Sequence, residues 1–231
     1  MFETFDRFAQ LVALRDFLKP LVVLLSVTLA SSAHATPLIS ELLYDAVGSD
    51  DGHGFVELAG TPGTILDGMT LEGVNGSNGA IGPVITLSGS IAADGLFVVA
   101  DTTSSGTTVV PLFDLLANFD FQNGPDSVVL RDSGGAVLDS LGYGVFGGGE
   151  VFAGEGAPAP DVAAGSSLAR LFADLDSDDN ALDFQELATP TPGVADFASV
   201  PEPGTAALMT VGLVTLTVLG RRRPVSGSRH S

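Results

Sequence analysis

The sequence contains no cysteine and no tryptophan, and basic residues are scarce. Without cysteine, neither a disulfide nor a thiolate nucleophile is available. The 231 residues include nine Lys and Arg against 28 Asp and Glu, for a formal net charge of −19. The bases lie mostly near the two ends, so positions 36–200 contain only Arg131 and Arg170 against 24 acidic residues. Nucleic acid is therefore not expected as a partner, because contacts with phosphates need a positively charged surface.

Positions 36–200 nevertheless contain short apolar runs throughout, unlike an acidic disordered tail. Their length suits one domain with an ordinary hydrophobic core. The excess of acids has two explanations that the sequence leaves open. It favours divalent cations as partners, and it also provides solubility and self-repulsion outside the cell.

Near the N-terminus, residues 21–30 form an uninterrupted run of ten mostly apolar residues after two basic ones. As a helix this run would rise only about 15 Å, which is too short to span a bilayer. Ala33 and Ala35 follow at the small-x-small spacing that signal peptidase reads. These features predict a secretory signal peptide over residues 1–35. The alternative, a buried core helix, is disfavoured because nothing globular precedes the run.

The C-terminus has three parts in series. They are a Pro-Glu-Pro tripeptide, an apolar run and an arginine cluster, namely Pro201, Glu202 and Pro203, residues 205–219, and Arg221, Arg222 and Arg223. From Gly204 to Gly220 the chain would measure about 25 Å as a helix, a marginal transmembrane span. The arginines would then stay on the cytoplasmic side. The prolines keep the segment before the span extended and accessible.

This arrangement over residues 200–224 resembles the PEP-CTERM sorting signal, with residues 225–231 as a short cytoplasmic tail. The resemblance implies transient anchoring in the inner membrane and cleavage near the motif by an exosortase, a transpeptidase-like membrane enzyme. It further implies transfer to the cell surface or extracellular matrix, with exopolysaccharide or envelope proteins as partners. A plain membrane anchor is the alternative, but an anchor has no need of Pro-Glu-Pro.

Between the two ends, short runs of Val, Ile, Leu and Phe alternate with clusters of Gly, Asp, Asn and Pro, a pattern of strands and turns. The pattern predicts an all-β domain over residues 36–199, built as an antiparallel β-sandwich. Strands are expected at 38–44, 54–58, 69–72, 84–87, 96–100, 127–131, 136–141 and 167–171. Residues 132–135 would close a hairpin, and residues 147–160 would form a long surface loop. Helix is expected only at 112–116 and 181–187.

Five pieces of this domain, in order along the chain, resemble the lamin-tail domain of bacterial proteins. They are Leu-Ile-Ser-Glu-Leu-Leu-Tyr-Asp at 38–45 with Phe-Val-Glu-Leu at 55–58, Leu-Asp-Gly-Met-Thr-Leu at 66–71, Ser-Ser-Leu-Ala-Arg at 166–170, Asp-Phe at 183–184 and Thr-Pro-Thr-Pro-Gly at 189–193. Met69 stands where the family usually has Trp. The resemblance implies an immunoglobulin-like β-sandwich, in agreement with the strand pattern.

Residues suited to catalysis are few. His53 is the single histidine of positions 36–200, so a Ser-His-Asp triad would have to use it. It lies in a turn-forming sequence, where a solvated loop histidine is the simpler interpretation. One histidine cannot supply the usual ligands of a zinc site. Two carboxylates could serve in glycoside hydrolysis, but pairs arise by chance among 24 acids. No catalytic residue is therefore predicted.

The densest acidic run has oxygen ligands at alternate positions, as calcium loops do. The candidate ligands are Asp174, Asp176, Asp178, Asn180 and Asp183. The run is not an EF-hand, because Asp179 stands where Gly is needed and Gln185 where a bidentate Glu should be. An irregular calcium turn and a solvated acidic loop are the two interpretations.

The end signals and the poor catalytic inventory together predict an exported, exosortase-sorted, non-enzymatic protein of the envelope or matrix. Its lamin-tail-like domain would serve binding or structure. A calcium-dependent adhesion module and a carboxylate-based hydrolase of exopolysaccharide are the alternatives, and fold alone cannot choose among them.

Overall fold

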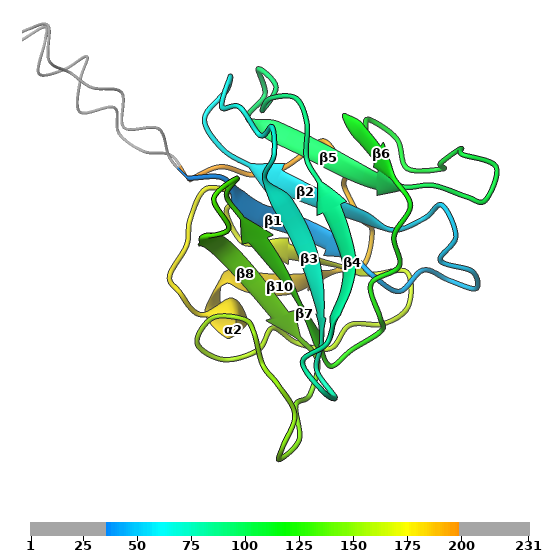
Figure 1. Ribbon diagram of the computed structural model, residues 1–231, viewed down its shortest axis with the longest axis vertical. Coiled ribbons are helices and arrows are strands. Elements are labelled where there is room, and N and C mark those ends of the chain that lie inside the picture. The colour runs from blue at the N-terminus through cyan, green and yellow to red at the C-terminus, as the bar shows by residue number, and fades with distance from the viewer. Residues whose placement is uncertain (1–35, 199–231) are drawn as a thin grey trace, which may run out of the picture.

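The computed structural model describes residues 36–198, which form two β-sheets packed face to face (Figure 1). The predicted signal peptide, with its cleavage site at Ala33 and Ala35, lies outside these residues. So does the Pro-Glu-Pro segment with its apolar run and arginine cluster. Within residues 36–198, no helix has the length and apolar character needed to cross a membrane.

The larger sheet has six strands. In spatial order they are β10 (Phe184–Leu187), β9 (Ser167–Arg170), β1 (Leu38–Leu43), β2 (Phe55–Ala59), β5 (Leu96–Asp101) and β6 (Leu115–Ala117). All neighbours pair antiparallel except β5 and β6, which are parallel. A one-turn helix, α2 (Asn180–Asp183), leads directly into β10. Strand β10, the last along the chain of the described residues, therefore forms one edge of the sheet that also contains the first strand, β1.

The smaller sheet has four antiparallel strands. In spatial order they are β4 (Ile81–Thr86), β3 (Thr70–Asn75), β7 (Asp126–Arg131) and β8 (Val137–Tyr143). The hairpin between β7 and β8 is closed as predicted, since the amide of Asp132 donates to the carbonyl of Ala136. The Asp132 carboxylate also accepts the amides of Gly134 and Ala136, which fixes the turn.

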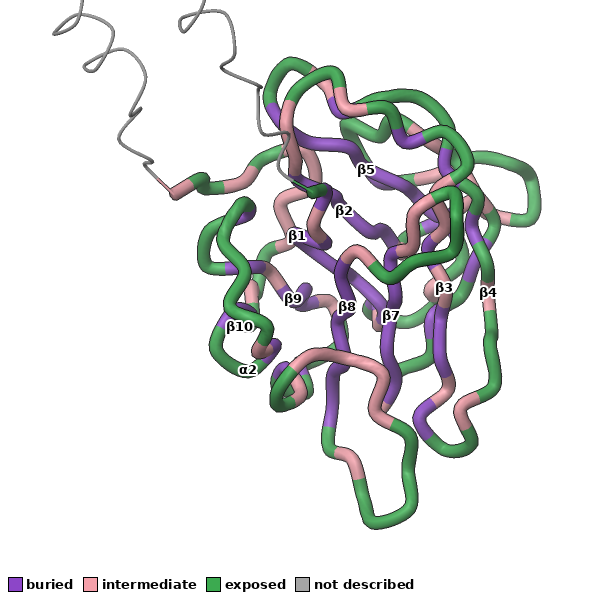
Figure 2. Tube along the Cα trace, turned by 60° about the vertical axis from the view of Figure 1, so that its left-hand side comes forward, coloured by how far each residue is buried: buried purple, intermediate pink, exposed green. Residues whose placement is uncertain are grey.

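The main core lies between the two sheets. The larger sheet contributes Ile39, Leu42, Val56, Leu58 and Val99, and the smaller sheet contributes Leu71, Val128, Leu130, Leu141 and Tyr143. A second cluster, made of Leu43, Phe55, Val98, Ala100 and Val110, covers the outer face of the larger sheet. Strands β1, β2 and β5 are therefore buried on both faces (Figure 2). This explains their nearly continuous apolar sequences, whereas β4 at the sheet edge is mostly exposed.

The prediction of an all-β domain with two sheets is confirmed. Each of the eight expected strands corresponds to an observed strand, with shifts of up to three residues at the ends. Residues 147–160 form an extended surface loop, anchored near its end where Ala159 bridges to Tyr143. Two further strands, β6 and β10, were not expected.

The helix expected at 112–116 is wrong. Leu112 has a φ of 55°, which ends any right-handed helix, and Leu115 begins β6. The cause is Asp114, whose amide donates to the carbonyl of Val98 and whose carboxylate accepts the amide of Val98. These contacts hold the segment against β5 in an extended conformation.

The helix expected at 181–187 is correct only for its first turn. Asp179 caps α2 by accepting the amide of Ala181. The chain then becomes extended at Phe184, which is buried in the main core and pairs with Arg170 of β9. Burial of Phe184 thus outweighs the weak local preference for helix.

Candidate functional site

The guanidinium of Arg170, at the end of β9, is buried between the two sheets. Its side chain is 0% exposed, as is that of Asp139 on β8. Nη2 donates to both carboxylate oxygens of Asp139, at 2.9 and 3.0 Å. Because Asp139 belongs to the smaller sheet, this ion pair ties the two sheets together.

The same two side chains hold the first residue of the main core. Nε of Arg170 donates to the carbonyl of Ile39 at 2.8 Å, and the Asp139 carboxylate accepts the amide of Ile39 at 2.6 Å. The ring of Phe184 lies against the guanidinium, with 4.6 Å between Cζ and the ring centroid. Strands β1, β8, β9 and β10 therefore all converge on one buried cation.

Two acids of the C-terminal region complete the surroundings of Arg170. Nη1 donates to Asp183 at 2.8 Å and to Asp176 at 3.2 Å. Burial opposes the charge of Arg170, but attraction by Asp139 and Asp176 outweighs it and raises the arginine's pKa. Burial raises the pKa of Asp139, and the attraction of Arg170 opposes this in part. For Asp183, hydrogen bonds from Ser177 and attraction by Arg170 exceed the effect of burial and lower the pKa.

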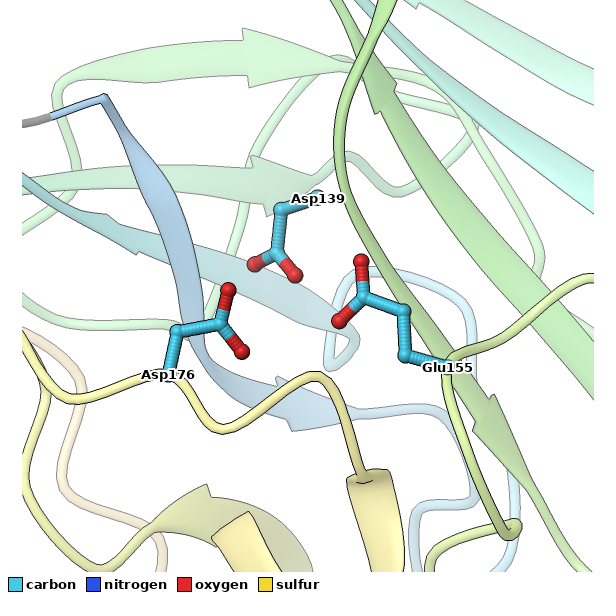
Figure 3. A group of neighbouring side chains, drawn as sticks. All are labelled: Asp139, Glu155 and Asp176. Carbon is cyan, nitrogen blue, oxygen red and sulfur yellow. The ribbon is translucent and has the colours of Figure 1, made fainter.

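Two of the acids that pair with Arg170 also belong to a group of three carboxylates. Asp139, Glu155 and Asp176 point toward one another (Figure 3), with one oxygen of each within 4.8 Å of the others. Oε2 of Glu155 is buried and has no hydrogen-bond partner among the described residues. Burial, reinforced by repulsion from Asp139 and Asp176, raises the pKa of Glu155 to about 7. Arg170 already supplies the positive charge beside two of the three carboxylates.

The five candidate calcium ligands are engaged with different partners. Asp174 accepts the amide of Ala198, and Asp176 pairs with Arg170. Asp183 accepts hydrogen bonds from Ser177 and Arg170. Asp178 is exposed, whereas Asn180 is buried. Among residues 36–198, Asp176 is the single one of the five that joins a group of three metal-compatible carboxylates. Calcium binding by this run stays a prediction.

Asn180, the first residue of α2, holds the loop formed by residues 147–160 in place. Its Oδ1 accepts the amides of Gly142 and Glu155, both at 2.9 Å, and Nδ2 donates to the carbonyl of Ser140 at 2.8 Å. Gly154 passes so close that an added Cβ would lie 2.4 Å from Oδ1. Asn180 thus positions Glu155 beside Asp139. Its place in the acidic run of residues 174–183 predicted a calcium ligand and gave no sign of this structural role.

A second buried acidic pair lies on the larger sheet. Glu41 of β1 and Glu57 of β2 are paired across the ladder and are 2% and 0% exposed. Glu41 accepts from the hydroxyl of Ser167 at 2.5 Å, and Glu57 accepts from the hydroxyl of Ser40 at 2.8 Å. Burial raises the pKa of both, that of Glu57 to about 7.

The other hydrogen bonds to these two glutamates come from residues 189–198, the last segment of the described domain, which we term the strap. Glu41 accepts the amide and hydroxyl of Thr191 at 2.9 and 3.0 Å, and Glu57 accepts the amide of Gly193 at 2.7 Å. Two carboxylates on neighbouring strands could in principle serve as a hydrolytic pair. Here the strap and two serines occupy their oxygens, so the pair works as an anchor.

The outer part of the strap is held less firmly. The carbonyl of Asp196 accepts the amide of Ala173 at 2.7 Å, and the amide of Ala198 donates to Asp174 at 2.6 Å. Phe197 lies against Gly95 in a hollow of about 300 Å³ that Thr36 also lines. The two ends of the described domain therefore lie at the same place on its surface.

The single histidine of positions 36–200 was expected to be a solvated loop residue. His53 lies in an exposed turn, where its Nδ1 is 3.1 Å from the carbonyl oxygen of Asp51. The sequence pattern did not reveal the anchoring roles of Glu41 and Glu57, although each stands within an apolar run. Nor did it reveal Asp139 and Glu155, which are brought to Asp176 only by the folded chain.

Comparison with known families identifies the segment that follows the strap. Residues 199–223 match the family described as the PEP-CTERM protein-sorting motif. The motif indicates an exported protein that is processed by an exosortase-type enzyme and sorted to the cell surface or the extracellular space. No match to the chain was found among curated proteins.

Proposed function

We propose that the chain is a non-enzymatic protein of the cell envelope or extracellular matrix, in which a lamin-tail-like β-sandwich serves binding or structure. The observation that carries this proposal is the position of the sorting motif. The match begins at residue 199, directly after a folded domain whose last described residue is still hydrogen-bonded to that domain. The chain thus presents one folded unit to the sorting machinery.

The contacts of the resembling pieces support the lamin-tail assignment. Glu41 and Glu57 come from the first piece and hold Thr191 and Gly193 of the last one. Arg170 ends the third piece and contacts both residues of the fourth, Asp183 and Phe184. Four of the five pieces therefore meet in two structural clusters. Their side chains stabilise the domain, which favours a scaffold over a hydrolytic site.

Processing is tested by mass spectrometry and fractionation of the protein in its native host, with a tag inserted after Gly148 in the exposed loop. We expect a secreted or surface product that lacks residues 1–35 and the region beyond Pro-Glu-Pro. In a strain without exosortase, and in a P201A/E202A/P203A variant, the full C-terminus should stay in the inner membrane. An identical uncut product in all three cases would show that the segment is a plain anchor.

The absence of enzymatic activity is tested on the purified domain with nucleic acid, protein and polysaccharide substrates. Hydrolysis that disappears in E41Q or E57Q, while these variants stay folded, would overturn the non-enzymatic assignment. A negative result would direct the search to matrix polysaccharides and envelope proteins as binding partners.

A calcium-dependent adhesion module is the second candidate, favoured by the convergence of Asp139, Glu155 and Asp176. Oxygen ligands of this kind suit calcium. This candidate predicts that millimolar calcium raises the melting temperature of the wild type by several degrees and does not change the melting temperature of the D176N variant. Calorimetry with no heat and no shift in melting temperature would exclude it. Magnesium is the control ion, because its stricter octahedral geometry disfavours such a site.

A further inference from the structure

The strap consists of two halves that are attached with different strength. Thr191 and Gly193 of the inner half donate three hydrogen bonds to carboxylates that are almost completely buried. The outer half, residues 194–198, is held to the rest of the domain by one hydrogen bond at Asp196, one at Ala198, and the packing of the small side chain of Ala195 on a buried apolar cluster. Val194 is 61% exposed and Phe197 is 38% exposed. The outer half can therefore detach at a much lower free-energy cost than the inner half.

The sorting motif begins where the outer half ends. Pro201 is three residues beyond Ala198, a distance of at most about 11 Å along an extended chain. Extended peptides are commonly recognised through main-chain hydrogen bonds, which requires backbone groups that are not already engaged elsewhere. With the strap docked, the backbone next to the motif is engaged at Asp196 and Ala198.

We propose that docking of residues 194–198 on the domain and binding of the motif by the exosortase compete for the same segment. This inference rests on the proposed processing of the chain. The outer half detaches when the enzyme binds, and the glutamate anchor at Thr191 and Gly193 stops the detachment there. The sandwich thereby stays folded while the adjacent segment is cut, and the segment docks again in the product.

The test compares processing rates in the native host by pulse-chase labelling. Phe197→Ala, Asp174→Ala and a Gly-Ser-Gly-Ser insertion after Ala198 are each expected to raise the rate about threefold to tenfold, since each removes a weak docking contact or the competition itself. Phe113→Ala is the matched control, because Phe113 is similarly exposed (44%) but lies outside the strap. In the chain with the insertion, Phe197→Ala should have no further effect.

Rates that equal the wild type in all three variants, with cleavage still dependent on exosortase, would overturn the competition and leave the processing intact. Cleavage that is independent of exosortase and of Pro201, Glu202 and Pro203 would overturn both the competition and the proposed processing. Thermal melting of the purified domains is measured in parallel. Equal melting temperatures for the Phe197→Ala and Phe113→Ala variants would show that a change in rate comes from the strap and not from unfolding.

Discussion

Replacing Arg170 with Met is expected to lower the free energy of unfolding by about 3–5 kcal/mol at neutral pH. The substitution leaves the Asp139 carboxylate, 0% exposed, without its ion-pair partner, and it removes the donor to the carbonyl of Ile39. A loss of this size is a large fraction of the stability of a typical domain. Urea unfolding followed by circular dichroism measures it, since the chain has no tryptophan.

Arg131 provides the matched control, as the other arginine of the described domain. It pairs with Glu72 at 2.8 Å, but its side chain is 28% exposed. Arg131→Met should therefore cost less than about 1 kcal/mol. Equal losses in the two variants would contradict the special role of Arg170. The double variant R170M/D139L should be more stable than R170M, because it also removes the buried Asp139 charge that the single substitution leaves without Arg170.

The stability of the wild type is expected to fall as the pH rises from about 5 to 8, and Glu57→Gln should remove part of this dependence. The pKa of Glu57 is raised to about 7 by burial, whereas in the unfolded chain it is about 4.5. A raised carboxyl pKa stabilises the fold below the unfolded value, and this contribution is lost as the pH passes through 7. The full difference corresponds to roughly 3 kcal/mol.

The side-chain amide introduced by Glu57→Gln can accept from Gly193 and donate to Ser40, so the variant keeps the contacts of the anchor. Unfolding curves at several pH values check the prediction, with Glu186→Gln on the exposed side of β10 as control. A pH profile that is the same in E57Q and the wild type would contradict it. Asp183 acts in the opposite direction, because its lowered pKa gives stability that is lost only in strong acid.

The strands of the fold could largely be predicted because their apolar runs are long enough to identify. The exceptions are instructive. The three residues of β6 have no strand pattern of their own, and they are extended because Asp114 binds the neighbouring strand. Strand β10 follows a helical turn without a break, and the burial of Phe184 together with the pairing to β9 fixes its conformation. Both depend on tertiary contacts, which a local pattern does not contain.

The clusters of the candidate site could be predicted only in part. The acidic run around Asp176 is conspicuous in the sequence and suggested a metal as its counter-ion. In the fold, Arg170 takes that role for Asp176 and for Asp139, which is distant in sequence. Both arginines of positions 36–200 lie in expected strands, at 127–131 and 167–171, and only the fold shows that Arg170 is the buried one. A cation in such a position needs buried acids around it.

The shared position of Thr36 and Phe197 has a consequence for how the domain is displayed. Since both ends of the described domain lie beside one hollow, an attachment through either end would act on the same pole of the sandwich. The loop that follows β8 projects from the opposite end of the molecule (Figure 1). Under the proposed sorting, an attachment on the C-terminal side would therefore also orient the domain, with this glycine-rich loop facing away from the point of attachment.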